Sequence, residues 1–277
     1  YIAGMEEREE VQDTLTPLDF GNIFHHVIYQ LYYPFINQKI NSDDIDQLLK
    51  NEKQIEDYLE KAFQELFFKM HKSSHKAEIM GHNLIGHEVL KRYLKQMLIR
   101  DREYTPFYFF GLEEQVKTTL KLEINGEQKA VNLRGKIDRV DSKDQRTRII
   151  DYKTGSPKLD FPSVESLFER NNKRNGEVFQ TFLYAMIYND SINDKNQQIE
   201  PALFVLSNLF KSDFDSAFSQ GSCRKKSRVD NWCSVRDEFK EGLQNILAEM
   251  LDENISFYQT EDRDICTYCA YKSICRR

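Results

Sequence analysis

The sequence predicts an α/β protein, and three patterns along the chain carry that prediction. A helical period of apolar residues dominates before Pro106, strict alternation replaces it afterwards, and a helix, a strand and a last helix follow. The predicted order of the central elements is therefore helix, three strands, helix and strand. With 277 residues, 40% of them hydrophobic and 12% aromatic, the chain is long enough to bury the core of such a fold.

The first helix is predicted to begin at Thr16-Pro17-Leu18-Asp19. Thr16 suits the N-cap, Pro17 suits the first helical position, and Asp19 is the acid three residues after the cap. We expect this helix to run to about Tyr33 and to end at Pro34. From Phe35 to Arg100 the pattern stays helical and is typical of an all-helical insertion. The buried stripe of the first helix is predicted to be Phe24, Val27, Ile28 and Leu31.

Three strands are predicted after this region. Apolar and polar residues alternate from Val116 to Ile124, and Asn125-Gly126 is a strong signal for a hairpin turn. A second strand is expected from Lys129 to Val140, a polar turn from Asp141 to Thr147, and a third strand from Arg148 to Lys153. Together they form an antiparallel meander.

The rest of the chain continues the α/β pattern. A helix is predicted from Glu177 to Asn189, a strand from Ala202 to Ser207 after Pro201, and an amphipathic helix from Val235 to Asn254. A short cysteine-bearing end follows.

Charge and composition argue against two classes of protein, those with a globally basic surface and those that are inserted in a membrane or secreted. The formal net charge of -6 argues against binding to nucleic acid through a globally basic surface. No apolar run approaches the roughly 20 residues that cross a bilayer, and the first residues lack the pattern of a signal peptide, so we expect a cytoplasmic protein without a membrane partner. Local basic clusters exist, and most such clusters are solvated surfaces; they comprise Arg134, Lys136, Arg139, Lys143, Arg146 and Arg148, then Arg170, Lys173 and Arg174, then Arg224, Lys225, Lys226 and Arg228.

Two carboxylates and a lysine on neighbouring strands point to metal chemistry. Asp151 and Lys153 are two residues apart in a strand and share a face, and Asp138 lies on the strand before them. An antiparallel turn brings Asp138 near Asp151. Two such carboxylates repel each other unless a cation lies between them, and Mg²⁺ prefers oxygen ligands. Taken singly, each of these residues is more often an ordinary charge at the surface.

These segments resemble a known family. G-x-x-D-R-[IV]-D at residues 135–141 and [IV]-D-Y-K-T-G at residues 150–155 are similar to motifs of the PD-(D/E)XK nuclease superfamily. They resemble its RecB-like branch, which includes AddB-type subunits and CRISPR-associated exonucleases. The first motif of that branch, G-x-x-x-H, resembles residues 21–25, and the last, Q-x-x-x-Y, resembles residues 180–184. The resemblance implies a restriction-endonuclease-like α-β-β-β-α-β core.

The resemblance also implies roles for individual residues. Asp138 and Asp151 would bind Mg²⁺ or Mn²⁺ with the Tyr152 carbonyl, and Lys153 would be catalytic. By analogy His25 completes the metal ligands; His26 is its rival, and the spacing from the glycine favours His25. Gln180 and Tyr184, one helical turn apart, would contact the DNA backbone or support the site, unless they are the ordinary polar edge of a core helix.

Two adjacent acids open the first strand, and the family often has an acid there. By the pleat, Glu114 falls on the face of Val116 and Leu120, whereas Glu113 falls on the polar face with Lys117. An inward acid is costly without a partner, so Glu114 is the predicted auxiliary site residue.

Three cysteines near the end, Cys266, Cys269 and Cys275, have spacing typical of metal or iron–sulfur ligation. Cys223 and Cys233 are expected to be ordinary free thiols. In the RecB-like branch a similar trio resembles part of a [4Fe-4S] site whose first cysteine precedes the histidine helix. That position would lie before Tyr1, so we expect an incomplete cluster in this chain.

The resulting prediction is a single nuclease domain over residues 1–277, forming the C-terminal part of a larger protein. It has a helical insertion at 34–105, a catalytic sheet and helix at 106–210, and a cysteine-bearing tail at 255–277. We expect a metal-dependent DNA exonuclease that works beside a helicase subunit in double-strand-break repair. Two alternatives stay open: an inactive DNA-binding or scaffolding domain of the same fold, and a structural iron–sulfur or zinc domain.

Overall fold

A computed structural model describes residues 14–70, 77–171, 174–192, 197–222, 225–267 and 269–276. The chain divides into two compact units. The helical unit comprises the residues up to Pro34 together with Ser42–Glu103, and the sheet unit comprises Phe35–Asn41 and Tyr104–Arg277. The central elements follow the predicted α-β-β-β-α-β order. Among the described residues, no helix is long and apolar enough to cross a membrane.

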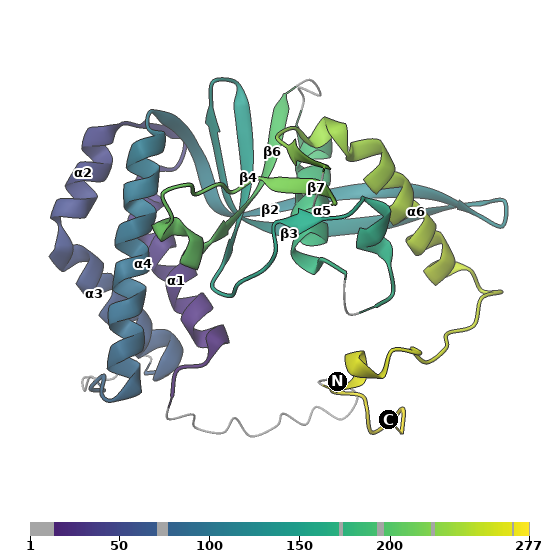
Figure 1. The fold of residues 1–277 in the computed structure, drawn as a ribbon, viewed down its shortest axis with the longest axis horizontal. Coiled ribbons are helices and arrows are strands. Elements are labelled where there is room, and N and C mark those ends of the chain that lie inside the picture. The colour runs from purple at the N-terminus through teal and green to yellow at the C-terminus, as the bar shows by residue number, and fades with distance from the viewer. Residues whose placement is uncertain are drawn as a thin grey trace. The chain divides into compact units, whose positions relative to one another are not determined.

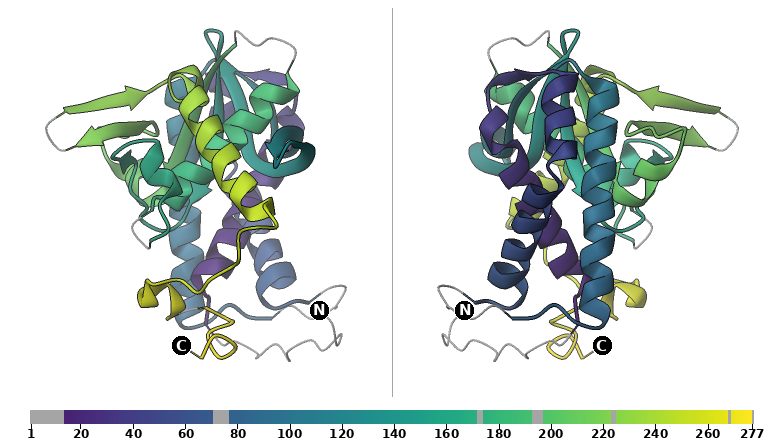
Figure 2. Two further views of the ribbon diagram at one scale, coloured as in Figure 1. Left: turned by 90° about the vertical axis from the view of Figure 1, so that its right-hand side faces the viewer. Right: turned by 90° about the vertical axis from the view of Figure 1, so that its left-hand side faces the viewer.

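The helical unit begins with helix α1 (Pro17–Tyr32), which starts as the sequence predicts. The Thr16 side chain accepts a hydrogen bond from the Asp19 backbone, and the Asp19 side chain accepts one from the Thr16 backbone. The predicted stripe of α1 is buried, and the hydroxyl of Tyr32 donates to the buried carboxylate of Asp101 in α4. The other helices, visible beside α1 in Figure 2, are α2 (Ser42–Lys50), α3 (Glu52–Ala62) and α4 (His82–Tyr104), with a π-helical turn at Phe63–Phe67.

The prediction of a purely helical region after Phe35 is wrong at one place. Strand β1 (Gln38–Ile40) pairs antiparallel with the start of β2, with Ile40 opposite Phe107. Asn37 precedes β1 with a left-handed backbone, φ 59°. A strand of three residues is too short to show an alternating pattern, so only its long-range pairing reveals it.

The main sheet has five strands in the order β1-β2-β3-β4-β6. All neighbours are antiparallel except β4 and β6, which run parallel and are connected through helix α5 (Gly176–Ser191) (Figure 1). Buried side chains of α5, among them Val178 and Phe182, pack with Ile149 of β4 and Leu203 of β6 in one core. The remaining strands are β2 (Phe107–Ile124), β3 (Glu127–Lys143), β4 (Arg146–Lys153) and β6 (Gln198–Val205).

Two turns connect β2, β3 and β4, and the sequence predicts one of them correctly. Asn125 and Gly126 form the first turn with φ values of 54° and 81°, as a two-residue hairpin requires. The second turn is only Asp144-Gln145, both left-handed, instead of the predicted stretch from Asp141 to Thr147. The prediction failed because Asp141 and Arg148 are polar but lie paired inside the sheet.

The later elements differ in extent from the prediction. β6 begins at Gln198, so Pro201 lies inside this strand; β6 is at the edge of the sheet, where a residue without a backbone N–H is tolerated. Helix α6 (Arg236–Leu251) ends before the predicted Asn254. A second sheet that the sequence did not reveal consists of β5 (Asp160–Phe161), β7 (Phe218–Ser222) and β8 (Lys225–Val229), of which the last two form the projecting hairpin in Figure 2.

Candidate active site

Strands β3 and β4 bring the three central residues of the predicted site together within the sheet unit. The Lys153 Nζ lies 2.8 Å from Oδ2 of Asp151, whose side chain is only 4% exposed. On the neighbouring strand, Oδ2 of Asp138 accepts a hydrogen bond from the backbone N–H of Tyr152 at 2.8 Å. Asp138 is therefore fixed against the same short segment of β4 that carries Asp151 and Lys153.

The charge of Lys153 is set by its surroundings. Burial by itself would lower the pKa of the Lys153 ammonium, but the Asp151 carboxylate outweighs burial, with a smaller contribution from Asp138, and raises this pKa. Lys153 is thus a cation held beside two anions. Its ammonium also donates to Oε1 of Gln180 at 3.1 Å, which fixes its direction.

Gln180 and Tyr184 continue this line of contacts along α5. The Gln180 amide donates to the Tyr184 hydroxyl at 2.9 Å, so both residues support Lys153. The Tyr184 ring lies directly over Gly135 of β3, where a Cβ atom would approach the ring to 2.8 Å. Gly135, the glycine of the G-x-x-D-R pattern, is therefore required for the close approach of α5 to the sheet.

The acid beside Asp138 is Glu113, one residue before the predicted auxiliary acid Glu114, whose role stays a prediction. Carboxylate oxygens of Glu113 and Asp138 lie within 4.8 Å of each other, and Glu113 also forms an ion pair with Lys136. Glu114 is exposed, with its carboxylate over Gly111. Glu113, whose backbone is left-handed with φ 57°, lies between Leu112 and Glu114, which pair with Arg139 and Ile137, so the register places it opposite Asp138.

A buried charge cluster lies on the other face of the same strands. Asp141 accepts hydrogen bonds from Arg139 at 2.7 Å and from Arg148 at 2.7 and 2.8 Å, and the side chains of Arg139 and Asp141 are fully buried. Arg139 also donates to the Tyr152 hydroxyl at 3.4 Å. We define Arg139, Asp141 and Arg148 as the buried triad. It anchors both strands directly behind Asp138 and Asp151. The sequence shows these residues only as parts of a basic cluster and a polar turn.

Comparison with known proteins agrees with this geometry. The family model described as the PD-(D/E)XK nuclease superfamily matches residues 1–276. The chain belongs to the PD-(D/E)XK nuclease superfamily.

Two curated relatives of this PD-(D/E)XK chain bear the same name, that of an ATP-dependent helicase/deoxyribonuclease subunit. The protein from Alkaliphilus metalliredigens is 24% identical over 210 residues, which cover 71% of this chain and 17% of the relative. The protein from Oceanobacillus iheyensis is 23% identical over an alignment of 343 residues, which covers 100% of this chain and 28% of the relative. The chain thus spans less than a third of either relative's length.

The donor atoms of this PD-(D/E)XK site fit a hard divalent cation. Carboxylate oxygens of Glu113 and Asp138 lie within 4.8 Å of each other, Asp151 adds a carboxylate on the adjoining strand, and Mg²⁺ and Mn²⁺ prefer such oxygen ligands. PD-(D/E)XK nucleases use divalent metals of this kind. A metal role for the Tyr152 carbonyl stays a prediction.

His25 and His26 lie on α1 in the helical unit, away from strands β3 and β4 in the sequence. The imidazole of His26 lies 3.7 Å from the Glu65 carboxylate, and burial lowers its pKa. The half-buried ring of His25 lies edge-on to Phe24. His26 thus has an acidic partner within its own unit. The assignment of His25 as a metal ligand stays a prediction.

The cysteine tail forms no such donor set. Cys266, Cys269 and Cys275 are free and half-buried, and among the described residues no three cysteines bring their sulfur atoms within 4.8 Å of one another. Cys233 is free and exposed, whereas Cys223 lies outside the described residues. The iron–sulfur assignment stays a prediction.

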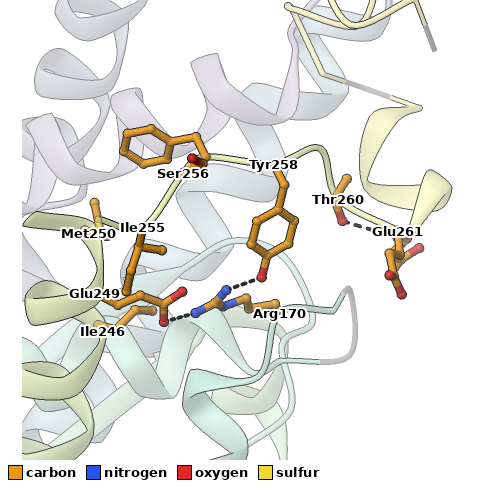
Figure 3. A pocket seen from close by; sticks show the side chains of 11 residues that line it. Arg170, Ile246, Glu249, Met250, Ile255, Ser256, Tyr258, Thr260 and Glu261 are labelled. Carbon is orange, nitrogen blue, oxygen red and sulfur yellow. Dashed lines mark hydrogen bonds and ion pairs between the residues drawn. The ribbon is translucent and has the colours of Figure 1, made fainter. Parts of the chain in front are cut away.

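A cavity of about 670 Å³ lies where the chain leaves α6 toward this tail (Figure 3). Arg170 connects its walls, because the guanidinium forms an ion pair with Glu249 of α6 and donates to the Tyr258 hydroxyl at 2.5 Å. None of the carboxylates around Asp138 lines it. The cavity is therefore formed where the tail packs beside α6 and Arg170, and is separate from the predicted site.

Proposed function

We propose that the sheet unit carries a divalent-metal-dependent nuclease site that hydrolyses phosphodiester bonds in DNA. The observation that carries this proposal is the convergence of Asp138, Asp151 and Lys153 on two adjoining strands. Membership of the PD-(D/E)XK superfamily supports it. The chain also has both acids and the lysine, whereas a degenerate site would lack one of them. Glu113 is the further acid that we add to this set.

The residues divide the chemistry between them. Asp138, Asp151 and Glu113 would hold the ion, which polarises a phosphoryl oxygen and lowers the pKa of a water bound to it. The Lys153 ammonium, held by Asp151 and Gln180, would neutralise negative charge that develops on the phosphoryl group. Tyr184 keeps Gln180 in place and so acts as a positioning residue.

The setting of this activity is inferred from the relatives. Both are named helicase/deoxyribonuclease subunits, which supports DNA as the substrate and a helicase as the partner. We propose that the chain is the nuclease part of such an assembly, that it degrades DNA from an end, and that it acts in double-strand-break repair.

A time course on linear and circular DNA tests both the metal and the end dependence of this proposal. With Mg²⁺ or Mn²⁺, end-labelled linear DNA should be shortened progressively while closed circular DNA of the same sequence stays intact, because an exonuclease needs an end. EDTA should stop the reaction, since the carboxylates alone cannot activate water. Cleavage of circular DNA would contradict end dependence, and cleavage in EDTA would contradict the metal.

A further inference from the structure

One face of the β2–β3 ribbon is exposed, with Lys117 and Lys121 on β2 and Arg134 and Lys136 on β3. Leu120 and Leu122 of β2 pack with Leu247 and Ala248 of α6, and Figure 1 shows α6 crossing the ribbon. Side chains alternate along a strand, so Lys117 and its neighbours of the same parity point to the opposite face. We define this opposite side as the outer face of the ribbon.

Two cations lie directly opposite each other on the outer face. Lys117 pairs with Arg134 in the β2–β3 register, and both are exposed. Like charges opposite each other on neighbouring strands destabilise a sheet. Within the described parts of the chain, no carboxylate lies within 4.0 Å of either side chain. The repulsion between Lys117 and Arg134 therefore lowers the stability of the fold unless an anionic ligand binds to them.

Several cations in the other basic clusters of the sheet unit have acidic partners. Ion pairs join Glu200 to both Arg146 and Arg228. Two further ion pairs join Arg170 to Glu249 and Lys226 to Asp160. Arg139 and Arg148 are buried against Asp141. Lys173 and Arg224 lie outside the described residues. Lys117 and Arg134 differ from these cations because, within the described residues, they face each other without an acidic partner.

One hollow beside the outer face also reaches Tyr184, which lies over Gly135 on the other side of the ribbon. An open hollow of about 800 Å³ is lined by Lys117, Arg134 and Lys136 together with Tyr184. A smaller hollow of about 360 Å³ continues along the ribbon past Lys117 and Arg134 to Asn132. The two hollows make one basic path along the hairpin.

Two lines of contacts join this path to the catalytic residues. In the first, Lys153 donates to Gln180, and Gln180 donates to Tyr184, which forms a wall of the larger hollow. In the second, Glu113, the acid beside Asp138, forms an ion pair with Lys136. DNA that lies in the hollow would therefore reach the scissile position without leaving the surface of the unit.

We propose that the outer face of the ribbon binds the phosphate backbone of the DNA substrate, with Lys117 and Arg134 as its main contacts. This inference rests on the proposed nuclease function and names the surface that holds its substrate. Arg134 and Lys136 lie two residues apart, about 7 Å along the strand, so neighbouring cations can contact successive phosphates. Such contacts carry no sequence preference and depend on salt.

The test measures DNA binding in EDTA, where cleavage is prevented. A fluorescent single-stranded oligonucleotide is titrated with the protein at salt concentrations from about 50 to 200 mM, and anisotropy gives the Kd. The double variant Lys117→Gln/Arg134→Gln should bind about tenfold more weakly. A plot of the logarithm of its binding constant against the logarithm of the salt concentration should have a slope shallower by about 1.4, which is about 0.7 for each of the two lost phosphate contacts. Lys225→Gln/Lys240→Gln removes the same charge elsewhere in the unit and should behave as the wild type.

Two further readouts separate the possible failures. The melting temperature of the Lys117→Gln/Arg134→Gln variant should not fall, because like-charge repulsion is removed. With Mg²⁺, its KM should rise while kcat at saturating DNA stays within about twofold. If the wild type binds DNA and both double variants bind it equally well, the inference is wrong while the nuclease proposal stands. If the wild type binds DNA but cleaves none with either metal, the nuclease proposal fails and the anisotropy comparison still decides the binding surface.

Discussion

Replacing Asp151 by asparagine is expected to reduce DNA cleavage by at least about a thousandfold. The substitution keeps the shape of a buried side chain but removes a metal-binding charge and the partner of Lys153. Lys153→Gln should lower the rate by about a hundred- to a thousandfold, because the ammonium is lost but the carboxylates stay. Single-turnover cleavage of labelled DNA with Mg²⁺ measures both effects.

Asp160→Asn is the matched control for these variants. Asp160 lies in the same unit but is exposed on β5, where its pair with Lys226 contributes little. Its cleavage rate should stay within about twofold of the wild type. Near-wild-type cleavage by both the Asp151→Asn and Lys153→Gln variants would show that the chemistry lies elsewhere.

Replacing Asp141 by asparagine is expected to have the largest effect on stability, a loss of about 3–5 kcal/mol in the free energy of unfolding. The substitution leaves the buried guanidinium groups of Arg139 and Arg148 without a counter-charge. Because domains are stable by only about 5–15 kcal/mol, much of the variant would be unfolded under mild denaturation. Urea unfolding of the two proteins measures the difference.

The same residue predicts an acid dependence. Burial alone would raise the pKa of Asp141, but the charges of Arg148 and Arg139 outweigh burial and hold this pKa below its ordinary value of 3.8. Asp141 therefore stabilises the fold above that value, and the contribution is lost as pH falls through the lower folded-state pKa. Over this window the variant should show a flatter stability profile than the wild type.

Asp144→Asn provides the control, because Asp144 is an exposed turn residue with a left-handed backbone that asparagine also adopts. Its stability should change by less than about 0.5 kcal/mol. Equal unfolding midpoints for the Asp141→Asn variant and this control would contradict a structural role for the buried triad.

The start of α1 and the turn between β2 and β3 could be predicted from the sequence because each depends on residues close together in the chain. The Thr16–Asp19 capping box and the Asn125-Gly126 turn each depend on residues next to each other in the chain. Asp151 and Lys153 were predicted to act together because strand geometry places residues two apart on one face, and Asp138 because an antiparallel turn brings it near Asp151. The family motifs then added Gln180 and Tyr184, and the structure places Gln180 in contact with both Lys153 and Tyr184.

Features that depend on distant partners could not be read in this way. The polar residues Asp141 and Arg148 indicated a turn, yet their mutual pairing buries them in the sheet. Glu113 lies opposite Asp138 because Leu112 and Glu114 pair with Arg139 and Ile137, and this register between two strands does not follow from the pleat of one strand. β1 has only three residues and exists through its pairing with β2. In each case the decisive interaction joins residues that no local pattern connects.

Binding of Mn²⁺ to the metal-free protein, measured by calorimetry, tests the central claim that these carboxylates form a metal site. Adjacent acids provide a matched pair: Glu113→Gln and Glu114→Gln make the same change one residue apart, but only Glu113 lies beside Asp138. The expected result is that Asp138→Asn and Glu113→Gln each weaken binding by at least about tenfold, whereas Glu114→Gln binds like the wild type. Undiminished Mn²⁺ binding by Asp138→Asn, or loss of binding with Glu114→Gln but not with Glu113→Gln, would contradict the site described for this protein.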